Sequence, residues 1–128
     1  MKFYLKQHHE GRYFLHEHPH GATAWQEEAV AKILGVPGVT TTVGDQCQYG
    51  LQSTTNNGAP IKKATRFMSN SKCMLAALSK RCEGRDGRCS RRGGGTHVWV
   101  SGREVGREAQ TYPKKLRKAI LRGLHRQL

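Results

Sequence analysis

The chain has 128 residues and carries 22 Lys and Arg against nine Asp and Glu, a formal net charge of +13. No apolar run approaches the roughly 18 residues of a membrane span, and residues 1–9 lack the apolar stretch of a secretory signal, so an intracellular protein is expected. Hydrophobic residues make up 36% of the chain, which predicts a small core.

The first third of the chain predicts a strand–helix–strand unit. We expect helical turns over 1–9, a strand over 12–16, a helix over 23–34 and a second strand over 39–43. Gly11 stops the first helix, while Trp25, Ala29 and Ile33 recur at the four-residue spacing of a buried helix face. This order has the length of a βαβ unit. It places residues 45–47 at the carboxyl end of the second strand, the edge where open α/β sheets carry their sites.

Short elements alternate with loops in the rest of the chain. We expect a loop over 52–60, a strand over 64–68, a helix over 71–81, a mobile Arg/Gly-rich loop over 83–96, a short strand over 97–100 and a helix over 113–128. Leu116, Ile120 and Leu124 form the apolar stripe of the last helix, and basic residues cover most of its remaining surface. These elements predict the α/β fold class: a single, truncated domain over 1–128 with a partial Rossmann-like sheet, flanking helices and a basic C-terminal helix.

The positive charge is confined to the second half of the chain. Residues 1–60 hold four bases and five acids, a net charge of −1, whereas residues 61–128 hold 18 bases and four acids, a net charge of +14. Such a half-chain predicts an anionic partner, nucleic acid first and an acidic protein or lipid surface second. Guanidinium groups among glycines are typical of a flexible segment that contacts phosphates, although a solvated charged loop has the same composition. The candidate nucleic-acid-binding residues are Arg81, Arg85, Arg88, Arg91, Arg92, Lys114, Lys115, Lys118 and Arg122.

Four cysteines in a chain without a secretory signal predict reduced thiols or a metal site rather than disulfides. Cys82, Cys89 and His97 bracket the Arg/Gly-rich loop, but their spacings of six and seven intervening residues lack the tight Cys pair of zinc modules. We therefore predict no metal and no other cofactor, with these three residues as the candidate ligands if a metal site exists. Cys47 is expected to be a buried thiol at a strand end.

A second group of metal-ligating residue types occupies the first strand. Side chains alternate along a strand, so His16 and His18 share one face and Glu17 takes the other. Two imidazoles on one face could chelate a metal, but the spacing places no third ligand beside them. Hydrogen-bonded or solvated imidazoles are the alternative interpretation of this pair.

A series of motifs covers nearly the whole chain. It comprises Gly11-Arg12-Tyr13-Phe14-Leu15-His16-Glu17-His18-Pro19, Ala22-Thr23-Ala24-Trp25, Pro37-Gly38-Val39, Asp45-Gln46-Cys47-Gln48-Tyr49-Gly50, Lys62-Lys63-Ala64-Thr65-Arg66-Phe67-Met68-Ser69-Asn70-Ser71, Arg81-Cys82, His97, Ser101-Gly102-Arg103, Ala109, Tyr112-Pro113 and Ala119-Ile120-Leu121-Arg122-Gly123. This series resembles a segment of copia-type retroelement polyproteins of protists and algae. That segment in turn is distantly similar to the second half of the cytosine-5 DNA methyltransferase catalytic fold.

The methyltransferase resemblance implies a role for one carboxylate. In that fold a strand ending in Glu-Asn-Val or Glu-Asn-Pro brings a carboxylate to the target cytosine, and Glu17, followed by His18-Pro19, matches the position. A carboxylate there hydrogen-bonds the base edge and assists attack on the ring. The chain lacks the Gly-rich methyl-donor turn and the Pro-Pro-Cys nucleophile loop of such enzymes. Glu17 is therefore expected to be a vestigial catalytic residue, and an ordinary strand-end carboxylate is the alternative.

Three functions remain open at this point. The first is a non-catalytic, retroelement-derived, methyltransferase-like fragment that binds nucleic acid through residues 81–92 and the terminal helix. The second is a small basic accessory subunit of a large assembly, whose charge contacts RNA or acidic neighbours. The third is half of a methyltransferase that needs a partner chain. We expect the first, with no enzymatic activity for the chain on its own.

Overall fold

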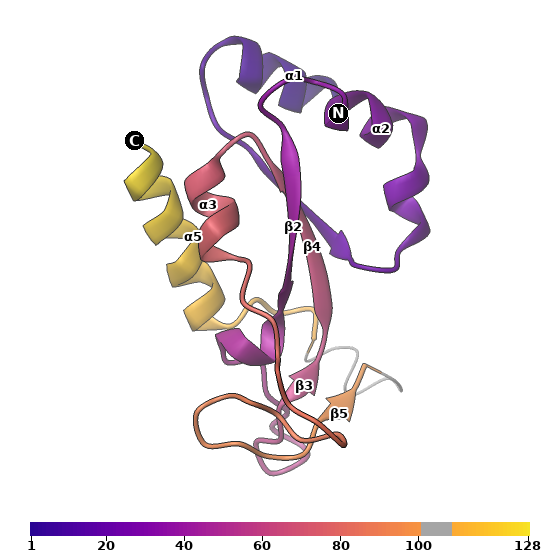
Figure 1. Ribbon diagram of the computed structural model, residues 1–128, viewed down its shortest axis with the longest axis vertical. Coiled ribbons are helices and arrows are strands. Elements are labelled where there is room, and N and C mark those ends of the chain that lie inside the picture. The colour runs from indigo at the N-terminus through magenta and orange to yellow at the C-terminus, as the bar shows by residue number, and fades with distance from the viewer. Residues whose placement is uncertain (101–108) are drawn as a thin grey trace.

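The computed structural model describes residues 1–100 and 109–128 and contains a three-stranded sheet flanked by helices (Figure 1). The sheet consists of β1 (Leu15–Pro19), β4 (Ala64–Ser69) and β2 (Thr40–Asp45), in the order β1-β4-β2. Both outer strands run antiparallel to β4 and are therefore parallel to each other. This mixture of helices and strands confirms the α/β class in its coarse form. The expected motif at 101–103 lies outside the described residues.

The central strand β4 is buried on both of its faces. Phe67 is 1% exposed and Met68 is fully buried. Because successive side chains of a strand point to opposite faces, these two residues belong to separate apolar clusters. The sheet is thus the middle one of three layers.

The N-terminal layer covers the Met68 face of the sheet. It comprises α1 (Lys2–His9), the short 3₁₀ helix η1 (Thr23–Gln26) and α2 (Glu28–Leu34). Val30 and Ile33 point inward from α2 and pack with Phe14, Trp25 and Met68. The predicted inward position of Trp25 and Ile33 is confirmed, but that of Ala29 is wrong: Ala29 is exposed, and Val30 points inward from α2 instead.

The C-terminal layer covers the Phe67 face with two helices that lie side by side in Figure 1. They are α3 (Lys72–Ala77) and α5 (Lys114–Gln127). Leu75, Leu78 and Leu116 meet Phe67 in the apolar cluster beneath them. A Cβ at Gly123 would lie 2.6 Å from the α3 backbone, so the absence of a side chain there lets the two helices approach closely. The predicted apolar stripe of the last helix is confirmed by the burial of Leu116.

The first strand begins later than the predicted range of 12–16. The side-chain oxygen of Asn70 accepts a hydrogen bond from the Phe14 backbone N–H at 3.0 Å, and its amide donates to the Arg12 carbonyl at 2.9 Å. These bonds satisfy the backbone before Leu15 without a strand partner. The predicted start of the strand is therefore wrong, and β1 pairs with β4 only from Leu15 onward.

The helix predicted over 23–34 is two helices. Glu27 has an extended backbone, with φ −64° and ψ 142°, and separates η1 from α2. The Trp25 indole donates to the Pro19 carbonyl at 3.0 Å, which holds η1 against the end of β1. The prediction of one continuous helix is wrong because this tertiary contact outweighs the local helical periodicity.

The helix predicted over 71–81 ends at Ala77. Ser71 caps its start by accepting a hydrogen bond from the Met74 N–H at 3.1 Å. At its end, the Tyr49 hydroxyl donates to the Ala77 carbonyl at 2.8 Å and accepts from the Lys80 N–H at 3.1 Å. The tyrosine thus satisfies backbone groups that a longer helix would have paired internally.

Smaller elements form the lower part of the molecule in Figure 1. The 3₁₀ helix η2 (Gln46–Tyr49) follows β2 directly, and the two-residue strands β3 (Ile61–Lys62) and β5 (Val98–Trp99) pair in parallel. The Arg/Gly segment 83–96 lies between α3 and β5, and its expected mobility stays a prediction. Within the described part of the chain, no helix combines the length and the apolar character needed to cross a membrane.

Candidate functional site

A buried carboxylate lies at the carboxyl end of β2. Asp45 is 1% exposed, and its Oδ2 accepts hydrogen bonds from the Cys82 backbone N–H at 2.7 Å and from Arg81 Nε at 2.9 Å. Lys62 Nζ lies 3.8 Å from the same oxygen. Burial acts to raise the pKa of Asp45, but these donors and charges lower it more, so its net shift is downward. Asp45 therefore holds the turn that carries Cys82 against the end of β2.

Three cysteine sulfurs and one imidazole converge beside this turn. They come from Cys47 on η2, Cys82 after α3, and Cys89 and His97 on the Arg/Gly segment and the residues that follow it. Their ligand atoms all lie within 4.8 Å of one another, and Cys82 Sγ is 3.7 Å from His97 Nε2. Sulfur and imidazole nitrogen are the ligand types of structural zinc sites. We call these four residues the cysteine–histidine cluster.

Polar hydrogens point at the sulfurs of the cluster. The Ser90 backbone N–H and hydroxyl both lie 3.5 Å from Cys82 Sγ. The Gln48 amide nitrogen lies 3.4 Å from Cys47 Sγ and 3.5 Å from Cys89 Sγ. Donors placed in this way stabilise the negative charge of a thiolate and orient a sulfur that ligates a metal.

Two cysteines of the cluster have opposite pKa shifts. Burial opposes ionisation of Cys82, but hydrogen bonds from Ser90 and Gly84 outweigh it and lower its pKa to about 6. Burial raises the pKa of Cys47 to about 12, and the nearby Cys89 adds to the rise. The two shifts favour the thiolate form of Cys82 and the neutral thiol form of Cys47.

Backbone pairing within the Arg/Gly segment brings Cys89 beside His97. The Cys89 N–H donates to the Gly95 carbonyl at 2.8 Å, and the His97 N–H donates to the Gly87 carbonyl at 2.7 Å. A Cβ at Gly84 would lie 1.8 Å from a backbone oxygen, so this tight fold of the chain requires glycine there. The glycines predicted to confer mobility therefore also allow the segment to fold back on itself.

The structure brings together the three candidate ligands predicted from the sequence and adds Cys47. The prediction that Cys47 is a buried thiol at a strand end is confirmed, and its sulfur also lies with those of Cys82 and Cys89. Sequence reasoning missed the contact because Cys47 precedes Cys82 by 35 positions, outside any local spacing rule. The available signal was its position at the carboxyl end of β2, the edge where such sheets carry sites.

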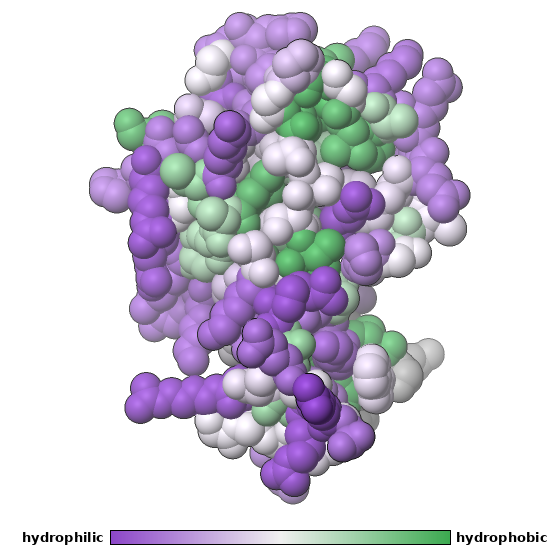
Figure 2. Space-filling model, in the orientation of Figure 1, coloured by the Kyte–Doolittle hydropathy of each residue, from purple (hydrophilic) through white to green (hydrophobic). Residues whose placement is uncertain are grey.

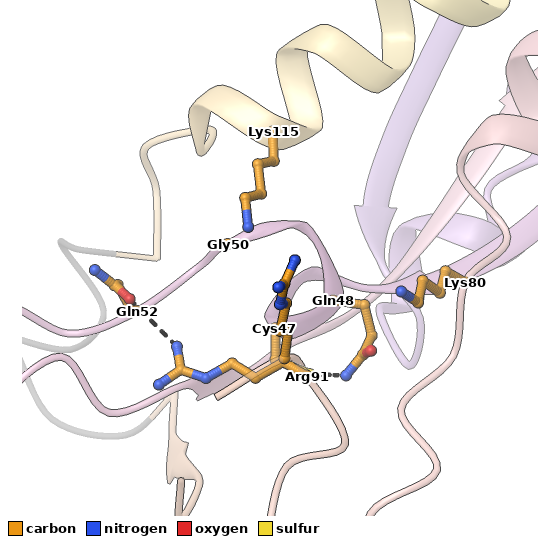
Figure 3. Close-up of a pocket in the computed structure, with 8 residues that line it drawn as sticks. Cys47, Gln48, Gly50, Gln52, Lys80, Arg91 and Lys115 are labelled. Atoms are coloured by element: carbon orange, nitrogen blue, oxygen red, sulfur yellow. Dashed lines mark hydrogen bonds between the residues drawn. The ribbon is translucent and has the colours of Figure 1, made fainter. Parts of the chain in front are cut away.

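Basic side chains line two adjoining hollows between α5, η2 and the Arg/Gly segment. The hollows have volumes of about 280 Å³ and 530 Å³ and share Gln48, Lys80 and Lys115. Figure 3 shows Lys80 and Lys115 at the edges of the smaller hollow, around Gln48. Together the hollows form what we call the cationic groove, whose basic residues are Lys80, Arg91, Arg92, Lys115, Lys118, Arg122 and Arg126.

The cationic groove is part of a larger hydrophilic surface. In Figure 2, hydrophilic side chains follow the edge of the molecule over α5 and continue across the lower part. Among the residues that the structure describes, no Asp or Glu lines either hollow of the groove. The charged side chains described around the groove therefore create a positive field inside it.

Five of the nine predicted nucleic-acid-binding residues line the cationic groove. They are Arg91, Arg92, Lys115, Lys118 and Arg122. Lys80 and Arg126 line it as well and were missed from the sequence. Lys80 lies between α3 and β5 in the chain. Lys80 and Arg126 face the same hollow only because α5 packs against α3.

The other four predicted residues lie outside the two hollows. Lys114 lines a neighbouring hollow of about 360 Å³. Arg85 and Arg88 are exposed on the Arg/Gly segment. Arg81 forms an ion pair with the buried Asp45, which partly neutralises its positive charge.

Arg91 holds two segments of the chain together as well as lining the groove. Its Nε donates to the Gly94 carbonyl at 2.6 Å and its Nη2 donates to the Gly58 carbonyl at 3.0 Å. Its Nη1 donates to Gln52 Oε1 at 3.2 Å, the bond drawn between these two residues in Figure 3. Replacing Arg91 would disturb the structure, so tests of the groove are better made on α5.

Glu17, the predicted vestigial catalytic residue, lies on β1 opposite Phe67. Burial raises the pKa of Tyr112, and the charge of Glu17 and a hydrogen bond to it raise that pKa further. Burial lowers the pKa of Lys63, and Glu17 opposes that shift. Glu17 lines neither hollow of the cationic groove. The structure thus places Glu17 beside Tyr112 and Lys63, and Glu17 is not a member of the cysteine–histidine cluster.

His16 and His18 share one face of β1, as predicted. Their rings meet edge to face at 4.6 Å, and each ring centroid lies 5.7 Å from that of Trp25. The Tyr4 hydroxyl lies 2.8 Å from His16 Nδ1. Among the described residues, the only group of three or more metal-ligating side chains that lie together is the cysteine–histidine cluster. The two histidines are therefore members of an aromatic cluster.

His16 is expected to make the free energy of unfolding depend on pH. The free energy should fall as the pH decreases below about 6.5, the ordinary pKa of histidine. Burial, followed by the neighbouring His18, lowers the pKa of His16, while Glu17 opposes the shift. The unfolded chain therefore takes up a proton at a higher pH than the folded chain does. Urea unfolding at several pH values should show a weaker loss of stability in His16→Gln than in the wild type. Replacement of the exposed His20 by Gln is the control and should keep the wild-type pH dependence.

No protein-family model, curated protein or solved structure matches the chain. The chain is a protein of mixed helices and strands whose C-terminal helix forms one wall of a cationic groove. A cysteine–histidine cluster adjoins that groove, because Cys47 lines its smaller hollow.

Proposed function

We propose that the chain binds nucleic acid in the cationic groove without catalysing a reaction on it. The observation that carries the proposal is the lining of the groove, in which the described residues include seven basic side chains and no acidic one. Lys and Arg side chains arranged in this way neutralise phosphates and release the counterions around them. Gln48 and Gln52 also line the groove and offer amide groups for hydrogen bonds to phosphates or bases.

The spacing of basic residues along α5 suits a phosphate backbone. Lys115, Lys118, Arg122 and Arg126 all line the larger hollow from this one helix. At about 1.5 Å per residue, these positions span about 16 Å. That length corresponds to about five base steps along one strand of a duplex. A short stretch of backbone can therefore contact several of these charges at once.

The origin of the domain is part of the same proposal. The motif series from Gly11 to Gly123 resembles retroelement polyproteins, and on that basis we infer a retroelement-derived, methyltransferase-like fragment. The parallel direction of β1 and β2, with α2 between them in the chain, supports a partial Rossmann-like sheet in which β4 is inserted. Glu17 is then the vestigial carboxylate.

Removing two charges from α5 tests the proposal. In Lys118→Gln/Arg122→Gln, nucleic-acid affinity should fall, and the slope of log K against log salt should become shallower by about 0.7–0.9 per lost phosphate contact. Fluorescence anisotropy with labelled single- and double-stranded DNA and RNA, between about 50 and 200 mM salt, measures both effects. The matched control is Lys2→Gln/Lys32→Gln, which removes the same charge from exposed positions in the N-terminal layer.

Three results would contradict the proposal. If the control pair weakens binding as much as the α5 pair does, net charge rather than the groove determines affinity. If the wild-type chain binds no nucleic acid at low salt but co-purifies with a large complex, the accessory-subunit function is favoured instead. Binding of a methyl donor by the isolated chain would contradict the non-catalytic part of the proposal.

A further inference from the structure

The cysteine–histidine cluster contains a complete set of ligands for one metal ion. Its four ligand atoms come from three separate parts of the chain, yet all lie within 4.8 Å of one another. A tetrahedral zinc ion with bonds of about 2.0–2.3 Å places its ligand atoms about 3.3–3.8 Å apart. The separation of 3.7 Å between Cys82 Sγ and His97 Nε2 is within that range. Small side-chain movements would bring the wider pairs into it.

The surroundings of the cluster suit a cation bound by sulfur. Ser90 and Gln48 direct polar hydrogens at the sulfurs, as groups around zinc thiolates do. Zn²⁺ with three thiolates and a neutral imidazole has a net charge of −1. The positive charges of Lys62 and Arg91 act at His97 against the negative charge of Asp45, and they would offset the charge of the bound ion. Three sulfurs and one nitrogen in a tetrahedral arrangement favour zinc over the harder divalent cations.

We propose that Cys47, Cys82, Cys89 and His97 bind one structural Zn²⁺ ion. Four protein ligands fill the coordination sphere, which is the arrangement of structural rather than catalytic zinc sites. The ion joins η2, the turn after α3 and the Arg/Gly segment with the residues that follow it. It fixes the segment that forms one wall of the cationic groove, but the site does not depend on nucleic-acid binding.

Metal content and cobalt spectroscopy of the full chain test the site. The chain purified under reducing conditions should contain one zinc per molecule by elemental mass spectrometry. Co²⁺ should bind with the same stoichiometry and give the visible bands of a tetrahedral site, with sulfur-to-cobalt charge-transfer absorption. Cys89→Ser should lose both signals. Cys73→Ser is the matched control and should retain them, because Cys73 lies on α3 outside the cluster.

A substitution that keeps the number of ligands separates metal binding from failure to fold. His97→Cys should still bind one Co²⁺, with charge-transfer absorption higher by about one third because a fourth thiolate replaces the imidazole. The proposal is overturned if the wild-type chain gives no tetrahedral cobalt spectrum, or if iron or copper occupies the site in place of zinc. Equal metal loss in Cys73→Ser and Cys89→Ser would also overturn it, as would a disulfide among the cluster cysteines in the freshly reduced chain.

Discussion

Replacing Leu116 with Ala is expected to lower the free energy of unfolding by about 2–5 kcal/mol. Leu116 is fully buried and packs with Phe67, Leu75 and Leu78 in the cluster between the sheet and the C-terminal layer. Truncation removes apolar contacts and leaves a cavity that the rigid β4 strand cannot fill. Chemical denaturation followed by circular dichroism measures the change.

Leu121→Ala is the matched control for this substitution. Leu121 lies on the same helix and is 65% exposed, so the identical change should alter stability by no more than about 0.5 kcal/mol. Equal losses of unfolding free energy at the two positions would mean that α5 does not pack on the sheet through the face that carries Leu116. The comparison also bears on function, because the same helix holds Lys118 and Arg122 at the groove.

Gly44→Ala is expected to destabilise the protein by about 3 kcal/mol or more. A Cβ at this position of β2 would lie 2.2 Å from the Leu78 carbonyl oxygen, which is a backbone atom. Neither side can move freely, because Gly44 pairs with Thr65 in the sheet and Asp45 holds the chain after Leu78 through its bonds to Lys80 and Cys82. The clash must therefore break one of these contacts, and the denaturation midpoint should fall accordingly.

Gly21→Ala is the matched control for the loss of stability in Gly44→Ala. No heavy atom lies within 4 Å of the Cβ position of Gly21, and its backbone conformation is one that alanine adopts without strain. This control should change stability by no more than about 0.5 kcal/mol. A Gly44→Ala chain as stable as the wild type would contradict the close approach of the turn after α3 to β2, which positions Cys82.

Part of the candidate site follows from spacing and part does not. Cys82, Cys89 and His97 were predicted as a group because they are close in the sequence, and the glycines between them let the segment fold back. Cys47 joins them only because η2 turns the chain after β2 and Asp45 holds the opposite turn in place. Nothing in the residues around Cys47 distinguishes such a ligand from an ordinary buried thiol.

The features that could be predicted from the amino-acid sequence are local and compositional. The division of charge at residue 60, the strands at 39–43 and 64–68 and the apolar stripe of the last helix all follow from patterns a few residues long. Such patterns persist because a strand or an amphipathic helix must bury its apolar side wherever it packs.

Tertiary packing sets which distant residues of the chain lie together. Packing of the folded chain placed β4 between β1 and β2, divided the helix expected over 23–34 and ended the helix expected over 71–81 at Ala77. It also brought Cys47 to its three potential co-ligands and placed Lys80 opposite the basic residues of α5. These outcomes depend on side-chain packing and on hydrogen bonds between segments far apart in the chain, such as those of Tyr49 and Asp45. The +13 charge is a property of the composition, but its concentration in one groove is a consequence of folding.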